Sequence, residues 1–87
     1  MIKKTQIIID LPQGLHARPS AKIVNLLKLY KAKVYVLYGE QECIADSLFN
    51  LLSLCIPHKA IVTLKAEGPQ ADEALKALVD LNRNNYN

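Results

Sequence analysis

Tryptophan is absent from this chain, phenylalanine occurs once and glycine three times in 87 residues. No segment therefore carries the aromatic and glycine motif on which common RNA-binding sheets stack bases, and Tyr35 and Tyr38 offer little in its place. No apolar run approaches the roughly 20 residues that span a bilayer, and the first residues lack the pattern of a signal peptide. We therefore expect a cytoplasmic protein with no membrane insertion and no nucleic-acid partner.

Cysteine is also scarce, and it occurs at positions 43 and 55. Two isolated cysteines do not make the dense disulfide framework of small secreted domains, so we expect buried, reduced thiols. Cys55 and His58 form a Cys-x-x-His pair, and with Cys43 and His16 they are an alternative candidate for a zinc site. No second close ligand pair supports that site, and no nucleotide-binding motif is present. We expect neither a metal nor another cofactor.

The composition is that of a globular chain, because 51% of the residues are hydrophobic and 22% are charged. The length predicts one domain over residues 1–87, which we expect to be a monomer. The net charge of +3 favours acidic protein surfaces or nucleic acid as partners and cannot choose between them. A small basic RNA-binding module therefore stays as a remote alternative.

Hydrophobic periodicity and turn residues divide the chain into strands and helices. We expect strands at about residues 5–10, 34–37, 42–44 and 60–66, and helices at about 17–30, from 47 onward and at 71–83. The isoleucine run of the first strand indicates a largely buried strand, and Tyr38-Gly39-Glu40 indicates a hairpin turn. Residues 82–87 are expected to be a frayed tail.

Both long helices have one polar stripe, formed in the first of them by Arg18, Lys22, Asn25 and Lys28. Each helix therefore has one apolar side to bury. The element order β-α-β-β-α-β-α then predicts an α+β fold, with a four-stranded antiparallel sheet and its helices over one face.

His16 is the candidate for reactive chemistry, because it lies where the loop after the first strand becomes a helix. Pro19 is tolerated in the first turn of a helix, which places His16 at or next to the N-cap. The first amides, at Ala17 and Arg18, then point out of the helix with the positive end of its dipole, which makes an anion site. The Arg18 guanidinium adds donors suited to phosphate oxygens.

A histidine near a helix start can instead be a solvated capping residue. Here Gly14 for the turn, His16 at the dipole, Arg18 within reach and Pro19 at the helix start coincide. Together they favour a histidine that holds a phosphoryl group covalently. No second titratable group lies near His16 in the sequence to act as acid or base, so an autonomous enzyme is not expected.

The segment Gly14-Leu15-His16-Ala17-Arg18-Pro19 resembles the active-site signature of the HPr family, the histidine-containing phosphocarriers of the bacterial phosphoenolpyruvate-dependent phosphotransferase system. A second block, residues 46–54, resembles the regulatory serine of the family and the short helix after it. A third block, residues 66–75, resembles the approach to its last helix. The resemblance covers essentially the whole chain and implies the HPr-like open-faced β-sandwich.

The resemblance implies that His16 accepts a phosphoryl group on Nδ1 from phosphorylated enzyme I and passes it to enzyme II A-domains of sugar uptake. Arg18 and the backbone amides of Ala17 and Arg18 would bind the phosphate. The chain would then be a covalent carrier and not an enzyme. A nitrogen-branch carrier of the NPr type is the alternative, and Gly68-Pro69-Gln70 leans slightly that way.

The family docks its partners on an apolar patch beside the histidine, and the matching residues are Leu48, Phe49 and Leu52, with Ala17 and Ser20 nearby. Core packing is the alternative for the leucines and Phe49, since part of a short amphipathic helix must face inward. Lys22 and Lys28 either contact acidic partner surfaces or are only solvated.

Ser47 matches the serine that HPr kinase/phosphorylase modifies in many family members. Its alternative is structural, because Asp46 and Ser47 are both good N-caps for the following helix. Asp46 would repel an added phosphate, and Asn50 stands where kinase-regulated members carry glycine. Gln13 replaces a small polar residue in the loop before the histidine. Regulation at Ser47 is therefore left open by the sequence.

Overall fold

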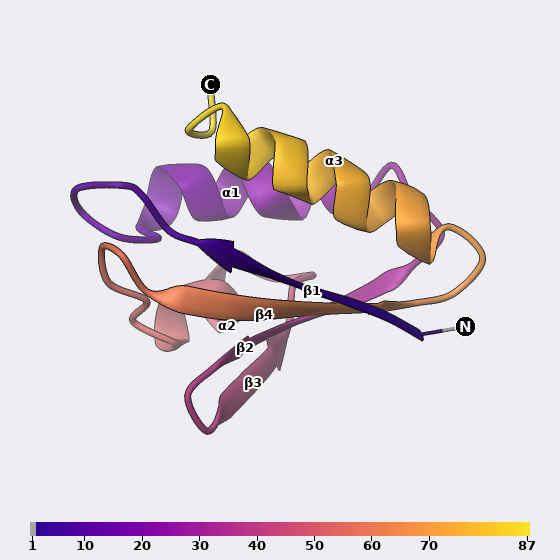
Figure 1. The fold of residues 1–87 in the computed structure, drawn as a ribbon, viewed down its shortest axis with the longest axis horizontal. Coiled ribbons are helices and arrows are strands. Elements are labelled where there is room, and N and C mark those ends of the chain that lie inside the picture. The colour runs from indigo at the N-terminus through magenta and orange to yellow at the C-terminus, as the bar shows by residue number, and fades with distance from the viewer. Residues whose placement is uncertain (1) are drawn as a thin grey trace.

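The computed structural model describes residues 2–87. Its elements are β1 (Ile2–Ile8), α1 (Ala17–Leu27), β2 (Lys33–Tyr38), β3 (Gln41–Ile44), α2 (Leu48–Ser53), β4 (Ile61–Glu67) and α3 (Ala71–Arg83). The strands form one sheet in the order β1-β4-β2-β3, with every neighbouring pair antiparallel. α1 and α3 lie across one face of the sheet (Figure 1), and α2 packs beside α1. The predicted α+β class, element order and antiparallel sheet are confirmed.

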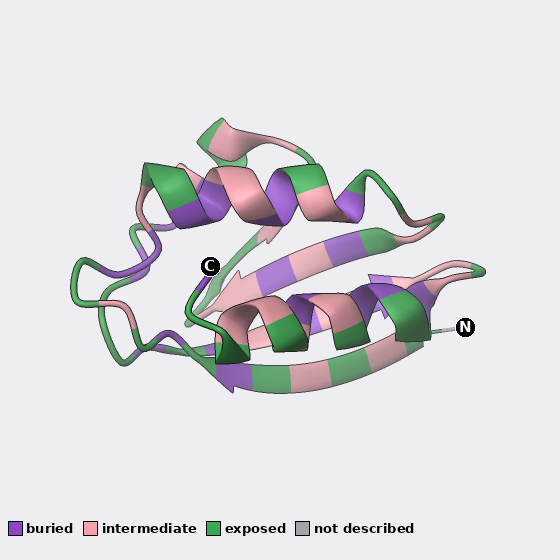
Figure 2. Cartoon of the chain, turned by 90° about the horizontal axis from the view of Figure 1, so that it is seen from above, coloured by how far each residue is buried: buried purple, intermediate pink, exposed green. Residues whose placement is uncertain are grey.

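The hydrophobic core lies between the sheet and the helices. Side chains along a strand alternate between the two faces, and Figure 2 shows buried and more exposed bands alternating along the strands. Val36 of β2 and Val62 and Leu64 of β4 are each 1% exposed. Ile23 of α1 and Leu78 of α3 belong to the same buried cluster. This core fixes α1, and with it the helix start that carries His16.

β1 is an edge strand with one buried face. Ile7 and Ile9 belong to the core, whereas Ile8 between them is 55% exposed. The prediction of a largely buried strand is therefore wrong, because helices cover only one side of the sheet. The strand also begins earlier than predicted, at Ile2, and ends at Ile8. The Asn82 side chain of α3 donates a hydrogen bond of 3.1 Å to the Ile8 carbonyl and so covers part of the free edge.

α1 ends at Leu27. The sequence pattern predicts a longer helix, which would end at about Tyr30. The N–H of Leu29 donates to the Leu26 carbonyl at 3.1 Å, and the N–H of Tyr30 donates to the Leu27 carbonyl at 3.2 Å. Bonds to the third residue back belong to a tight turn, which commonly closes a helix. This turn leads the chain into β2.

The last residues of the chain are folded back onto the protein. α3 covers Ala71–Arg83 as predicted, but the expectation of a frayed tail is wrong. Tyr86 is 5% exposed, its N–H donates to the Leu81 carbonyl at 2.9 Å, and its hydroxyl donates to Asn82 Oδ1 at 2.8 Å. Burial raises the pKa of Tyr86 to about 12.

Both cysteines are free thiols. Cys43 lies opposite Val36 on the helix-facing side of the sheet and is half-buried, and this burial raises the pKa of its thiol. Cys55 is exposed, so the expectation of burial is wrong for it. Cys55 lies in the turn after α2, in a left-handed conformation with φ of 51°. No helix within residues 2–87 is long and apolar enough to cross a membrane.

Candidate functional site

The loop before α1 is held against the loop before β4. Gly14 has φ of 69°, a conformation that side-chain-bearing residues rarely adopt, and its Cα faces the carbonyl of Ile56 and the backbone of Pro57. A Cβ at this position would overlap the Ile56 oxygen. The next residue, Leu15, donates its N–H to that same oxygen at 2.9 Å and buries its side chain. Glycine is therefore required at position 14 for the close contact between this loop and the backbone of Ile56 and Pro57, which places the start of α1.

His16 is the N-cap residue of α1, as the position of Pro19 predicts. Its backbone is extended, with φ of −82° and ψ of −170°, and its carbonyl accepts a bond of 3.1 Å from the N–H of Ser20. The imidazole makes no capping hydrogen bond, and the residue is half-buried rather than fully exposed. The ring is therefore not engaged in closing the helix.

The first turn of α1 presents positive potential next to this ring. Ala17 and Arg18 are exposed, and the first turn contains no acidic residue that would neutralise the positive end of the helix dipole. The first amides of a helix have no acceptor within it, and Pro19 carries no N–H at all. Within residues 2–87 Arg18 forms no ion pair. The turn can accept an anion without first breaking a salt bridge.

His16 and Arg18 line a pocket of about 190 Å³. Leu11 and Pro19 contribute to it from the same loop and helix, and Asn85, Tyr86 and Asn87 contribute from the C-terminal segment. Sequence reasoning missed these three residues, because the tail was expected to fray. The lone aromatic side chain in an otherwise polar tail was the signal that could have indicated burial.

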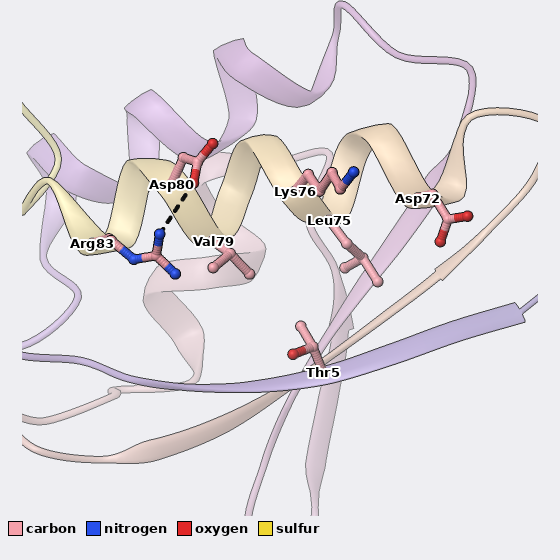
Figure 3. A pocket seen from close by; sticks show the side chains of 7 residues that line it. All are labelled: Thr5, Asp72, Leu75, Lys76, Val79, Asp80 and Arg83. Atoms are coloured by element: carbon pink, nitrogen blue, oxygen red, sulfur yellow. Dashed lines mark ion pairs between the residues drawn. The ribbon is translucent and has the colours of Figure 1, made fainter.

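A larger groove of about 500 Å³ lies between β1 and α3. Figure 3 shows the side chains that line it. They are Thr5, Asp72, Leu75, Lys76, Val79, Asp80 and Arg83. Acidic and basic groups are mixed there, with Arg83 and Asp80 paired at 3.8 Å and Asp72 facing Lys3 at 3.9 Å. The groove shares no lining residue with the His16 pocket.

α2 divides its apolar side chains between the core and the surface. Leu51 is 0% exposed, Leu48 and Leu52 are half-buried, and Phe49 is 79% exposed. An exposed phenylalanine on a helix that packs against α1 makes an apolar surface available beside the helix that His16 starts. The predicted docking residues Leu48, Phe49 and Leu52 thus lie on the accessible side of α2.

Ser20 does not belong to that surface, so its prediction as a docking residue is wrong. The residue is 0% exposed, and its hydroxyl donates to the Leu15 carbonyl at 3.2 Å. Burial of a serine requires such a partner, and this bond ties α1 to the loop before it. Ala17, the other predicted docking residue on α1, is exposed.

Of the two candidate N-caps, Asp46 and Ser47, it is Ser47 that takes the N-cap position of α2. Its backbone is extended and its carbonyl accepts the N–H of Leu51 at 3.3 Å, but its hydroxyl makes no capping hydrogen bond. The exposed carboxylate of Asp46 accepts a bond of 3.4 Å from the Asn50 amide, which also donates to the Ile44 carbonyl. Asn50 therefore braces the start of α2, and the Asp46 charge stays next to Ser47.

The alternative zinc site is not assembled. Within residues 2–87 no three histidine, cysteine or acidic side chains lie close enough together to hold a metal ion. His58, in the loop before β4, instead lies 3.2 Å from the carboxylate of Asp10, in the loop between β1 and α1.

A sequence model of one protein family, the PTS HPr component phosphorylation site, matches residues 3–84 of this chain. The chain belongs to the HPr family. The phosphocarrier protein HPr of Vibrio cholerae is 41% identical over 76 residues, which cover 87% of this chain and 89% of that protein. A crystal structure of HPr-C-His from Thermoanaerobacter tengcongensis has 34% identity and a TM-score of 0.92, and covers 97% of this chain and 94% of that one.

HPr-like sequences also occur inside longer proteins. The phosphoryl donor subunit DhaM of the PEP-dependent dihydroxyacetone kinase of Providencia stuartii is 33% identical over 82 residues. The match covers 94% of this chain but 17% of that subunit. Membership of the HPr family assigns this chain to the phosphocarriers of the phosphotransferase system.

Proposed function

We propose that this chain accepts a phosphoryl group on His16 from phosphorylated enzyme I and passes it to enzyme II A-domains of the sugar phosphotransferase system. One observation carries the proposal. The imidazole at the N-cap of α1 makes no capping bond and opens, together with Arg18, onto a pocket. Relatives of this chain carry the name phosphocarrier protein HPr, and by family resemblance that type of carrier serves the sugar branch.

The transfer is a displacement at phosphorus. The lone pair of the neutral His16 imidazole forms the new N–P bond while the bond between phosphorus and the donor's histidine breaks, and its electron pair returns to the donor. By family resemblance the accepting atom is Nδ1. The free amides of Ala17 and Arg18 and the guanidinium of Arg18 then face the phosphoryl charge.

The stabilisation of the phosphoryl group on His16 has to be moderate, because that group must be passed on to the next partner. A helix dipole contributes about 1–2 kcal/mol to an anion at a partly buried terminus, which is small enough to keep transfer reversible. The protein itself acts as a covalent intermediate between enzymes.

Partner docking is assigned in this proposal to Leu48, Phe49 and Leu52 of α2 together with Ala17. The exposure of Phe49 supports it, since a large apolar side chain open to solvent favours a protein contact. Enzyme I and the A-domains would use the same surface in turn, because each must bring its own histidine to the His16 pocket.

Ser47 is proposed as a regulatory site for HPr kinase/phosphorylase. Its support is a hydroxyl with no capping bond, while the neighbouring Asp46 carboxylate opposes the added charge. Incubation with the kinase and ATP, followed by phosphopeptide mapping, tests this part. Labelling that survives Ser47→Ala would contradict it.

The carrier proposal is tested by labelling with phosphoenolpyruvate and enzyme I. Acid-labile label on the wild-type chain and none on His16→Ala is expected, because phosphohistidine hydrolyses in acid whereas phosphoserine does not. The labelled protein is then offered to a sugar-type A-domain, a nitrogen-type A-protein and a dihydroxyacetone kinase. Transfer to the sugar-type acceptor supports the proposal, preferential transfer to the nitrogen-type protein favours the alternative, and label on His16→Ala refutes the assignment.

A further inference from the structure

The C-terminal segment turns back toward the start of α1 immediately after α3. Asn85 and Tyr86 both have positive φ, 55° and 62°. The N–H groups of residues 84–87 donate to the carbonyls of Asp80, Asn82, Leu81 and Asn84 in turn, at 2.9–3.2 Å. Asparagine tolerates the left-handed conformation, whereas tyrosine rarely adopts it. Contacts with the rest of the protein must therefore hold Tyr86 in place.

Lys22 supplies the contact from α1. Its ammonium donates a hydrogen bond of 2.6 Å to the carbonyl oxygen of Tyr86, 64 residues away in the chain. A bond this short from a charged donor is among the stronger hydrogen bonds of a protein. The Tyr86 ring is buried and its hydroxyl is bonded to Asn82, so both ends of this residue are fixed.

The same segment forms a wall of the His16 pocket. Asn85, Tyr86 and Asn87 line it together with the residues contributed by the loop and α1, among them His16 and Arg18. Lys22 follows Arg18 by four residues, so the two side chains lie on one face of α1. The Lys22 bond thus holds the tail over the face of the helix from which Arg18 projects.

We infer that Lys22 is a positioning residue, which holds residues 85–87 as a wall that limits the access of water to phosphorylated His16. This inference rests on the proposed function. The reaction that the wall slows is hydrolysis: a water oxygen forms a bond to phosphorus, the N–P bond breaks, and its electron pair returns to the imidazole. Inorganic phosphate leaves and the displaced proton goes to solvent. A carrier needs slow hydrolysis, because its cargo must survive until the next partner arrives.

Two measurements on Lys22→Met test the inference. Amide hydrogen exchange of residues 85–87 in the unphosphorylated protein reports whether the tail is released, and it does not depend on the proposed function. The hydrolysis rate is followed by ³¹P NMR on protein phosphorylated with phosphoramidate, using the signal that His16→Ala lacks. Failure of enzyme I to label the wild-type chain therefore refutes the proposed function without affecting this comparison.

We expect Lys22→Met to raise both rates about fivefold to tenfold, since it removes one charge-assisted hydrogen bond. Lys22→Arg keeps a charged donor and should restore both rates to within about twofold of the wild type. The matched control is Lys76→Met, which removes the same charge from an exposed position on α3. We expect it to change neither rate.

Three outcomes overturn the inference. Unchanged exchange in Lys22→Met means that the lysine does not hold the tail. Raised exchange with hydrolysis within twofold of the wild type means that the tail does not shield the phosphoryl group. Faster hydrolysis in Lys76→Met to the same extent means that net charge, and not the Lys22 bond, sets the rate.

Discussion

The N–H of Leu15 and the carbonyl of Ile56 lie 2.9 Å apart and join the loop before α1 to the loop before β4. For this bond to form, the backbone of the preceding residue, Gly14, must lie close to the same Ile56 oxygen. The placement of the His16 loop against the rest of the fold therefore depends on a contact between segments that are distant in the sequence.

Gly14→Ala is expected to destabilise the protein strongly. A methyl group would overlap the Ile56 oxygen, and alanine would also be strained at φ of 69°. Left-handed strain and overpacking together cost about 2–4 kcal/mol. The control is Gly39→Ala, which has a similar φ of 61° but nothing within 4 Å of the added carbon, so it should cost about 1 kcal/mol. Urea unfolding measures both, and equal costs would contradict the role of the Ile56 contact.

His16→Ala should abolish phosphoryl acceptance and leave the fold intact. The imidazole is half-buried and makes no capping bond, so its removal should change the free energy of unfolding by less than about 1 kcal/mol. His58→Ala is the control, because it removes the other histidine and only an exposed contact to Asp10. Labelling by enzyme I should be lost in the first variant and kept in the second. Loss of label in both would implicate His58.

Arg18→Ala should slow transfer without stopping it. The side chain is exposed and forms no ion pair within residues 2–87, so the unfolding transition should stay where it is. Losing charge-assisted bonds to the phosphoryl group should lower the transfer rate about 10-fold to 100-fold. Arg18→Lys should fall between the two, since an ammonium lacks the planar fork of donors. Stopped-flow phosphotransfer from enzyme I measures the rates, and wild-type rates in Arg18→Ala would remove the residue from the site.

Phe49 and Leu51 should separate docking from packing on the same short helix. Phe49→Ser changes a side chain that is 79% exposed, so it should weaken binding to enzyme I with little effect on stability. Leu51→Ala removes a side chain with 0% exposure and should cost about 2–5 kcal/mol of stability. Isothermal titration and thermal unfolding distinguish the two effects. Unchanged affinity in Phe49→Ser would exclude it from the docking surface.

Local signals in the sequence were sufficient for the helix start at His16 and for both ends of α3. Pro19 and Gly14 act through backbone geometry within a few residues, so their consequences are readable along the chain. Acidic residues at the start of α3 and Arg83 at its end agree with the helix dipole in the same local way.

The burial of Ser20 and of the tail was not predictable in this way. Ser20 is buried because the Leu15 carbonyl turns toward its hydroxyl, which depends on how the loop docks on Ile56. Tyr86 is fixed by Lys22 and Asn82, and the lysine lies 64 residues away in the sequence. Polar tails usually fray, and here local hydrogen bonds together with the long-range contact from Lys22 hold the tail in place.

Burial of Tyr86 should make the stability of the protein fall at high pH. Burial raises the pKa of Tyr86 to about 12, above the unfolded value near 10, so the folded state holds the proton more tightly. The resulting stability is fully present below about pH 10 and is lost as the pH rises toward 12, and a shift of about two pKa units corresponds to roughly 2–3 kcal/mol. Tyr86→Phe removes the hydroxyl, so it should lose both the hydrogen bond to Asn82 and this part of the pH dependence of stability. Urea unfolding of both proteins from pH 9 to 12 measures the difference, and parallel pH profiles would contradict the buried phenol.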